Sequence, residues 1–462
     1  MTLADLPLSV RVLSPELLLV AAGGVLAVVP RKAGLGTASK RVSVLAILAV
    51  AAAAGAWMWV VPDGEAFAGR LAATELSKIL GLLILGGAGL TLLATLGAEP
   101  ASLAGRRLPL LLWILATVLL ALRSQDLVPL GVALAIASLG SSGWFRPGDP
   151  RRSEHAQSAW VVTATFIYAT AILYGETGAT RIDAIAGAFA VGLTGSTVLA
   201  HLGLFLLLLA TLWRGGLVPF HRGATALFET VSPAVFFLTT VLRVLGLSLL
   251  ARLLTIAVYA ADLPRFRGIL VLGAASMMLG SLVAVARRDL PGTFGYLLLA
   301  HLGMAILPLA SPEPQLRGVI YAAATAVAAA VATVVGIADL GRRQDFAGLG
   351  RHRPSAALGL LLSLAALSGL PLTAGFGNAW TAAQWALGQD LPILAAGVLA
   401  SCCLGLLLTV RIGRDLFRQG VEKQGRDTML ADFASSAGSR LALSAAGAAL
   451  IGGGVIFLLR LA

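Results

Sequence analysis

Charged and titratable side chains occur inside several of the most apolar segments of this 462-residue chain. Arg214 and His221 flank a stretch that contains glycine and proline, Glu229 follows it, and Arg243 and His301 lie within long apolar runs. Histidine exchanges a proton near neutral pH, and burial raises the pKa of glutamate, but the arginine guanidinium stays charged in proteins. These residue types indicate a buried charge network or proton path in which both arginines are fixed cations.

A structural interpretation stands beside each of these roles. Arg214 and Arg243 can pair with Glu229 or bind backbone carbonyls that a helix break leaves free, since an unpaired charge within a membrane is expensive. His221 can hold the turn that follows the break, and His301 can be a hydrogen-bonded residue of the protein interior. The sequence leaves both interpretations open for all five residues.

The other histidines and the cysteines give no indication of a metal or haem site. The five histidines form no HxxxH or HExxH pattern, and Cys402 and Cys403 are adjacent, which fits neither metal-ligand spacing nor a structural disulfide. We expect His201 to be a satisfied interior residue, and Glu154 and His155 to cap a helix that follows a basic loop. The sequence therefore predicts no cofactor and no metal.

The composition indicates a chain that is embedded in a lipid bilayer. It is 58% hydrophobic and 12% charged, with a mean hydropathy of +0.91, whereas a soluble domain has about 25% charged residues. This excludes an ordinary soluble protein and a disordered one. The net charge of +12 comes from basic residues in short runs between apolar segments, so we expect contact with lipid headgroups and not with nucleic acid.

Apolar runs long enough to cross or nearly cross a bilayer predict an all-α polytopic protein with about fourteen transmembrane helices. The predicted helices are Leu13–Val29, Val42–Val61, Ile79–Leu96, Leu108–Leu122, Leu127–Trp144, Ala159–Tyr174, Ala184–Trp213, Ala234–Leu254, Ile269–Ala286, Phe294–Leu309, Gly318–Leu340, Ala356–Leu387, Ile393–Ile412 and Leu441–Leu461.

Arginine and lysine are distributed unevenly between the two sets of loops that this topology creates. With Arg214 left out because it lies at the first helix break, the odd-numbered loops hold 21 of them and the even-numbered loops hold 7. Cytoplasmic loops carry the excess of basic residues in membrane proteins. The odd loops are therefore predicted to be cytoplasmic, which leaves both termini on the outer side.

Glycine- and proline-rich stretches interrupt two of the predicted helices, one near Pro219, just after Ala184–Trp213, and one near Pro371, within Ala356–Leu387. Proline removes a backbone donor, and the freed carbonyl must find a partner in protein or water. Matched breaks in the two halves of a chain are typical of inverted repeats with an ion path between them. We therefore expect a three-helix segment at 1–107, a first five-helix repeat at 108–256, a second at 257–412, and a loop with the last helix at 413–462.

At these residues the sequence resembles the antiporter-like membrane subunits of complex I, most closely the N-type subunits of bacterial NADH-quinone oxidoreductase. The resemblance covers nearly the whole chain and depends on the order and spacing of several motifs. These are Leu173–Gly178, Trp213–His221 with Glu229 and Pro233, Gly295–Gly303, Leu349–Arg351 with Pro354, and Leu364–Phe376.

The resemblance implies a role in the membrane arm of a large redox complex in the bacterial inner membrane. Subunits of this family pass protons through a buried series of glutamate, lysine and histidine, and they carry no redox cofactor of their own. The partners implied are the other membrane-arm subunits, which deliver the redox energy. The isolated chain is expected to have no enzymatic activity.

The sequence departs from the family at the titrating positions. The key glutamate corresponds to Ala135 and its partner lysine falls near Ser158. Two further lysines become Arg214 and Arg243, and the lysine after the second break corresponds to Ala379. Desolvated lysine can release its proton near neutral pH, whereas arginine cannot and alanine has none to release.

Four functions follow from these observations. The chain can be a complex I-type subunit that still moves protons through histidines and water, or one that has lost conduction and supports the assembly. It can belong to a related multisubunit cation/proton antiporter, membrane-bound hydrogenase or inorganic-carbon uptake complex. The motif order argues against a secondary transporter that works alone.

Overall fold

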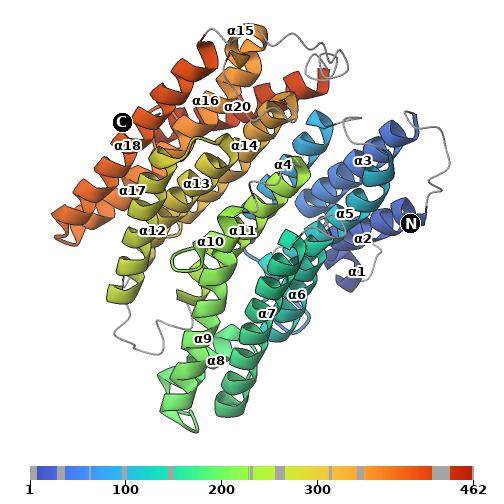
Figure 1. Cartoon of the computed structure of the whole chain (residues 1–462). Helices are drawn as coiled ribbons and strands as arrows, with labels where there is room; N and C mark the ends of the chain where they lie inside the picture. The colour runs from blue at the N-terminus through green and yellow to red at the C-terminus, as the bar shows by residue number, and fades with distance from the viewer. Residues whose placement is uncertain are drawn as a thin grey trace. The chain divides into compact units, whose positions relative to one another are not determined.

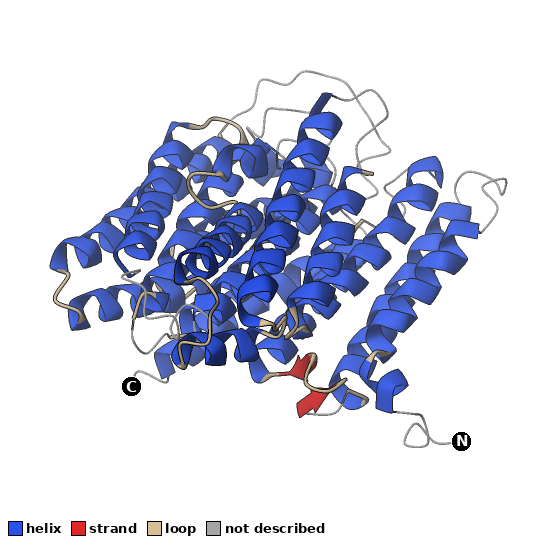
Figure 2. Ribbon diagram, turned by 90° about the horizontal axis from the view of Figure 1, so that it is seen from below, coloured by secondary structure: helices blue, strands red, loops and turns tan. Residues whose placement is uncertain are grey.

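The computed structural model describes residues 8–28, 37–61, 64–95, 101–143, 150–226, 228, 233–254, 266–311, 315–340, 348–418 and 437–459. These residues are almost entirely helical, and the prediction of an all-helical polytopic membrane protein is confirmed (Figure 2). One short antiparallel pair of strands is present among them, β1 (Gly64–Ala66) and β2 (Leu71–Ala73), with Gly64 opposite Ala73.

The chain forms two compact units, which are described separately. Unit 1 comprises Met1–Gly89, Glu99–Gly215 and Leu242–Arg265, and unit 2 comprises Leu90–Ala98, Gly216–Val241 and Phe266–Ala462. The last residues of α4 and the first half of α11 therefore belong to unit 2.

Unit 1 is built from long apolar helices. Its helices are α1 (Leu8–Val12), α2 (Ser14–Val28), α3 (Thr37–Trp59), α4 (Glu75–Ala94), α5 (Ala101–Arg123), α6 (Leu127–Ser142), α7 (Pro150–Thr177), α8 (Ile182–Ala190), α9 (Thr197–Gly215) and the second half of α11 (Pro233–Leu253). In this unit α2 packs against α3 and α5, α5 against α6, and α7 against α6 and α9 (Figure 1).

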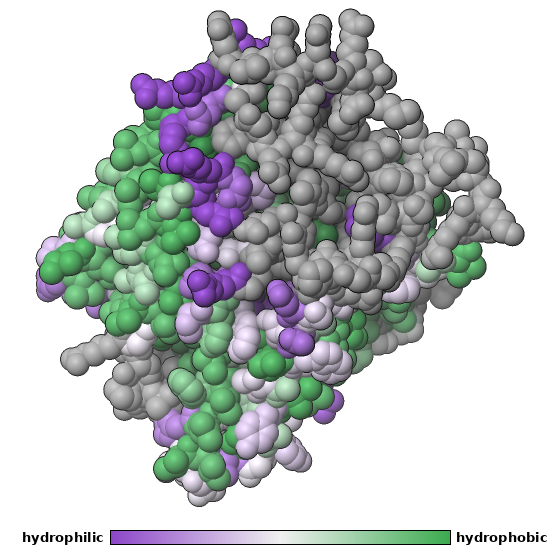
Figure 3. All heavy atoms as spheres, viewed as in Figure 1, coloured by the Kyte–Doolittle hydropathy of each residue, from purple (hydrophilic) through white to green (hydrophobic). Residues whose placement is uncertain are grey.

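Unit 2 has the same character. It contains α10 (His221–Ala226), α12 (Phe266–Ala286), α13 (Leu290–Ile306) with a 3₁₀ turn (Leu307–Leu309), α14 (Arg317–Leu340), α15 (Leu349–His352), α16 (Pro354–Leu367), α17 (Ala374–Gly388), α18 (Pro392–Phe417) and α20 (Ala437–Leu459). Within it α13 packs against α12, α14 and α17, so that α13 lies in the interior, whereas α18 exposes an apolar face. On the face seen in Figure 3, the coloured side chains of this unit are mostly hydrophobic, and hydrophilic side chains gather toward its α15 end.

Ten helices of the described chain are long and apolar enough to cross a membrane, and three shorter apolar helices accompany them, Ser14–Val28, Leu127–Ser142 and Pro354–Leu367. All fourteen predicted segments contain helix, but two of them are divided. The run Ala184–Trp213 forms α8 and α9, and the run Ala356–Leu387 forms α16 and α17. The division of Ala356–Leu387 confirms the interruption predicted near Pro371. The turn between α8 and α9 was not assigned from the sequence, because glycine and small polar residues let the chain leave the helix without losing overall hydropathy.

Candidate buried polar sites beside the helix interruptions

The first interruption follows α9. This helix ends at Gly215, Gly216 adopts a φ of +65°, and α10 begins at His221 after a cis Val218–Pro219 peptide bond. A positive φ suits glycine because it has no Cβ to clash with the backbone. The Val218 N–H donates to Ser276 Oγ of α12 at 3.1 Å, so a side chain satisfies one backbone donor that the helix no longer pairs.

Arg214, the penultimate residue of α9, binds α6. Its Nη1 donates to Ser138 Oγ at 2.8 Å, and the Ser138 side chain is buried. Ser138 comes one helical turn after Ala135, so the two lie on the same face of α6. The serine therefore supplies a neutral partner for the arginine close to where the resemblance implies a carboxylate. The pairing with Glu229 that the sequence suggested involves a residue outside the described part of the chain.

Two further polar contacts join α6, α7 and α9. Ser141 Oγ donates to Ser138 O at 2.6 Å and is hydrogen-bonded to His155 Nε2 at 2.6 Å. A hydroxyl that donates to Ser138 O can only accept from the ring, which requires the ring proton on Nε2. Trp213 Nε1 donates to Ser158 Oγ at 3.0 Å. We call this group the serine cluster, consisting of Ser138, Ser141, His155, Ser158, Trp213 and Arg214.

His155 is a residue whose place the sequence interpretation missed. It was expected to cap a helix, but α7 begins at Pro150 and the histidine lies one turn inside it, facing α6. The available signal was spacing, because His155 and Ser158 share one face of α7 and Ser138 and Ser141 share one face of α6. Polar faces on two consecutive helices can pack against each other and form hydrogen bonds between the helices.

Arg243 is buried within α11, with 1% of its surface exposed. One turn further on, a Cβ added to Gly246 would lie 2.3 Å from the backbone nitrogen of Gly215. The missing side chain lets α11 approach the end of α9 directly beside Arg214. Both predicted fixed cations thus belong to helices that meet at the end of α9.

The second interruption separates α16 from α17 over residues 368–373. Gly369 and Leu372 have φ values of +72° and +69°, and Pro371 is exposed within this turn. A Cβ added to Gly375 at the start of α17 would lie 1.7 Å from Ala366 O and 3.2 Å from His301 Cε1. The ends of the two half-helices therefore meet backbone to backbone, with the histidine of α13 against them.

His301 is fully buried at this interruption. Its backbone carbonyl accepts a hydrogen bond from Asn378 Nδ2 of α17 at 2.8 Å, and its ring lies beside the backbone of Leu367. Neither ring nitrogen has a hydrogen-bond partner of standard geometry among the described residues, and the same holds for Asn378 Oδ1. Buried polar atoms in proteins are normally paired with protein or ordered water, so these side chains keep hydrogen-bonding capacity that the described residues do not use.

The other two predicted histidines lie elsewhere. His221 is the first residue of α10, and its ring meets the edge of Tyr296 of α13 at a centroid distance of 6.2 Å. His201 is half-buried on α9, and its Nδ1 lies 2.6 Å from the Thr197 carbonyl of the same helix. The structure thus brings Arg214 to the serine cluster and His301 to the second interruption, while His201 takes part in neither site.

A buried ion pair in unit 1 was not predicted. Arg123 at the end of α5 pairs with Glu16 of α2, donates to Val12 O at 2.7 Å, and lies 4.8 Å from the centre of the Trp57 ring. Both side chains are buried. Each charge was visible in the sequence at the end of an apolar run, but only the packing of α2 against α5 brings them together. No three His, Cys, Asp or Glu side chains come together as a metal site among the described residues.

Comparisons with known proteins agree with this architecture. Residues 150–405, more than half of the chain, match the family model described as NADH:quinone oxidoreductase/Mrp antiporter, TM. The chain is 28% identical over 424 residues to the NADH-quinone oxidoreductase subunit N 1 of Rhizobium meliloti, covering 87% of each chain. It is 30% identical over 318 residues to subunit N of Rhodococcus opacus, covering 63% of this chain and 57% of that protein.

Solved structures share the fold. A chain of respiratory complex I from Thermus thermophilus matches with a TM-score of 0.72 at 21% identity, covering 95% of this chain and 97% of that one. A chain of the Mrp complex from Dietzia sp. matches with a TM-score of 0.72 at 19% identity, covering 98% and 93%. The chain thus belongs to the NADH:quinone oxidoreductase/Mrp antiporter transmembrane family, as an antiporter-like membrane subunit related to the N subunits of NADH-quinone oxidoreductase.

Proposed function

We propose that this chain is an antiporter-like membrane-arm subunit of a complex I-like NADH-quinone oxidoreductase in the bacterial inner membrane. It would contribute to redox-coupled proton translocation alongside the other membrane-arm subunits. The curated relatives named subunit N support this assignment, as does the match to a complex I chain over nearly the full length. The charge distribution between loops supports fourteen spans with both termini on the outer side.

Two inverted five-helix repeats would organise the subunit. The first would consist of α5, α6, α7, the broken pair α9/α10 and α11, and the second of α12, α13, α14, the broken pair α16/α17 and α18. The second helix begins in the same way in both proposed repeats, which supports this organisation. Asp126 and Asp289 are the N-cap residues of α6 and α13, and each is the last residue of a three-residue link. Ser138 and His301 come at the same distance in sequence after these aspartates (138 − 126 = 301 − 289 = 12).

The single observation that carries the proposal is the buried ring of His301 beside the second interruption. Its nitrogens have no standard protein partner among the described residues, and the adjoining Asn378 Oδ1 has none either. Histidine exchanges protons near neutral pH. We infer that His301 carries protons in the second half, while the arginines are fixed cations where related subunits have lysine. In the first half, the serine cluster replaces the carboxylate with hydroxyls and His155, and Glu229 remains a candidate partner there.

The test measures protons translocated per electron pair by the purified complex in liposomes. His301→Ala is expected to lower this ratio while quinone reduction continues. His201→Ala is the matched control, because it removes the same ring from a half-buried position on α9. Arg214→Lys should keep or raise the ratio, since a buried lysine can lose its proton.

A different result would assign the subunit a supporting role. If Arg214→Ala and His301→Ala both left the ratio unchanged, with the complex fully assembled, the subunit would not lie on a proton path. The chain would then stabilise the membrane arm without conducting.

A second candidate function has its own support. The matched family model includes Mrp antiporter proteins, and a chain of an Mrp complex shares the fold. Membership of a related multisubunit cation/proton antiporter would place the same fold among different partners. Mass spectrometry of the complex purified natively through a tag on this chain distinguishes the two, because only the first assembly contains an NADH-oxidising module.

A further inference from the structure

Arg411 of α18 binds the end of a neighbouring helix in unit 2. Its Nη1 donates to Val285 O at 2.6 Å and its Nη2 donates to Arg287 O at 2.8 Å. Because α12 ends at Ala286, these carbonyls belong to the helix end, where the last carbonyls have no partner within the helix. A guanidinium at this position also meets the negative end of the helix dipole.

Arg252 of α11 makes the equivalent contacts in unit 1. Its Nη1 donates to Ala121 O and Leu122 O, both at 3.3 Å, and its Nη2 donates to Ser124 O. Helix α5 ends at Arg123. In both units the acceptors therefore include the penultimate residue of the helix and the first residue after it.

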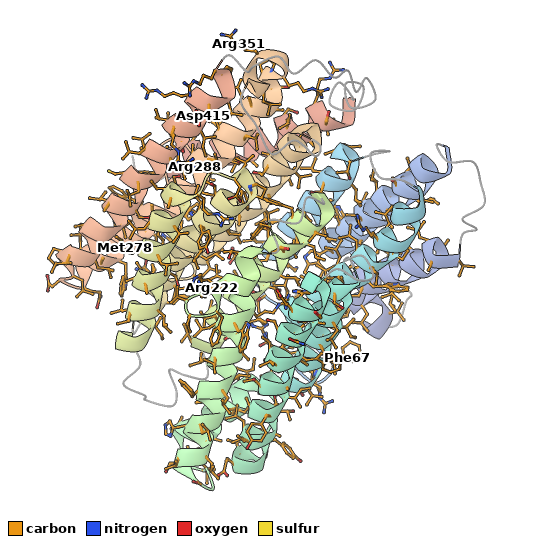
Figure 4. The ribbon with its side chains drawn as sticks, in the orientation of Figure 1. Phe67, Arg222, Met278, Arg288, Arg351 and Asp415 are labelled. Carbon is orange, nitrogen blue, oxygen red and sulfur yellow. The ribbon has the colours of Figure 1, made fainter. Side chains whose placement is uncertain are left out.

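The two arginines also occupy the same place in sequence. Each is nineteen residues after the proline that begins its helix, since 252 − 233 and 411 − 392 are both 19. Each helix end that they bind is followed by a link of three residues, 124–126 or 287–289, which ends in the N-cap aspartate of the next helix. Arg288, labelled in Figure 4, is the middle residue of the second link.

The N-cap aspartates are themselves held in the same way. Asp126 Oδ1 accepts from Val128 N at 2.9 Å, and Asp289 Oδ2 accepts from Gly292 N at 2.8 Å. Each aspartate also pairs with an arginine, Asp126 with Arg70 at 3.5 Å and Asp289 with Arg287 at 2.7 Å. The direction in which α6 and α13 leave the link is therefore fixed by the carbonyls and the carboxylate together.

We propose that Arg252 and Arg411 are equivalent positioning residues. Each closes a five-helix repeat by hydrogen bonds from the last helix to the carbonyls at the end of the first helix, and we call this set of bonds the clasp. The proposal rests on the repeat organisation proposed above. The clasp sets the start of the second helix, which carries Ser138 in one repeat and His301 in the other. A planar guanidinium reaches two carbonyls at once, whereas the lysine ammonium is a single point charge on a flexible stem. The arginine side chain is therefore required at both positions.

Hydrogen–deuterium exchange of the full-length protein within its complex tests the clasp. Arg411→Lys keeps the positive charge but loses the planar guanidinium that donates to two carbonyls. It should make the amides of Gly292 and Thr293 exchange about tenfold faster, which corresponds to about 1.4 kcal/mol. Arg252→Lys should do the same for Val128 and Leu130, and neither variant should affect the other link. Arg414→Lys is the matched control, since Arg414 is exposed on the same helix as Arg411.

Every outcome decides the proposal. Unchanged exchange in Arg411→Lys, or equal changes in Arg414→Lys, would overturn the clasp, and a response in only one link would overturn the equivalence. If Arg252→Lys does not fold, Arg411→Lys still tests the clasp in its own unit.

A second readout separates positioning from simple support. If Arg411 positions the second helix, Arg411→Lys should lower the number of protons moved per electron pair in the assembled complex. A smaller quantity of assembled complex would not by itself change this ratio. If His301→Ala lowers this ratio and Arg411→Lys does not, the positioning role is wrong. If His301→Ala leaves the ratio unchanged while exchange in the links responds, the proposed proton path fails and the clasp stands.

Discussion

Adding one methyl group at Gly375 is expected to force apart the two half-helices at the second interruption. The new Cβ would lie 1.7 Å from Ala366 O, and ordinary contact begins at 3.4 Å, so the two backbones would have to separate by 3.4 − 1.7, or roughly 1.7 Å. The neighbouring atom is a backbone oxygen, which cannot rotate away as a side chain can. The same Cβ would lie 3.2 Å from His301 Cε1, so the histidine ring would also shift.

In Gly375→Ala, two contributions to the free energy of unfolding oppose each other. Overpacking a well-packed interior costs about 1–3 kcal/mol, and we expect the upper end because backbone must move. Replacing glycine by alanine within a helix stabilises the folded state by about 0.5–1 kcal/mol. The free energy of unfolding should therefore fall by about 2 kcal/mol. Gly452→Ala is the control, because this helical glycine of α20 has no atom within 4 Å of the added Cβ and should be neutral or stabilising.

Thermal unfolding of the full-length protein in detergent, followed by tryptophan fluorescence, measures both variants. Trp380 and Trp385 lie on α17 and report on the half-helix that Gly375 begins. An unfolding midpoint for Gly375→Ala equal to that of Gly452→Ala would refute the reasoning, because it would mean that the two half-helices separate without cost.

Three other substitutions have expected effects in the same unfolding assay. Ser138→Ala removes the hydroxyl that accepts from Arg214 and should cost about 1.5–3 kcal/mol, the usual range for a hydrogen bond to a charged group. Glu16→Gln leaves Arg123 buried without its counter-charge and should cost about 3–5 kcal/mol. Asn378→Ala loses the 2.8 Å hydrogen bond to α13 and should cost about 1–2 kcal/mol.

Each of these substitutions has a control on a more exposed position. Ser142→Ala loses only a bond to the carbonyl of Leu139 in the same helix, and Glu75→Gln and Gln384→Ala change exposed side chains. If a control lowered the unfolding midpoint as much as its partner, the contact named for that partner would not be the cause of the loss.

Several features of this protein were visible in local sequence. The composition excluded a soluble chain because a bilayer demands continuous apolar runs, and each predicted run contains helix. The position of the second interruption could be predicted from Gly369 and Pro371, because the backbone conformations that these residues favour are local properties. Arg214 could likewise be identified as a cation at the end of a broken helix.

The partners of these residues depended on which helices lie side by side. Ser138, Ser141 and His155 are small or ambiguous in sequence, and Ser138 acquires its role only because α9 brings Arg214 to the face of α6. The pair of Glu16 and Arg123 is separated by 107 positions in the chain, and no periodic pattern connects residues that far apart.

Helix formation and membrane insertion were thus determined by the sequence, since both depend on the chemistry of neighbouring residues along one chain segment. The pairing of charges, the place of His301 against Gly375, and the clasp of Arg411 on Val285 and Arg287 were decided only by tertiary packing. The physical reason is range: hydropathy and backbone preference act over a few residues, whereas a hydrogen bond between helices exists only once both backbones are fixed within a few ångströms of each other.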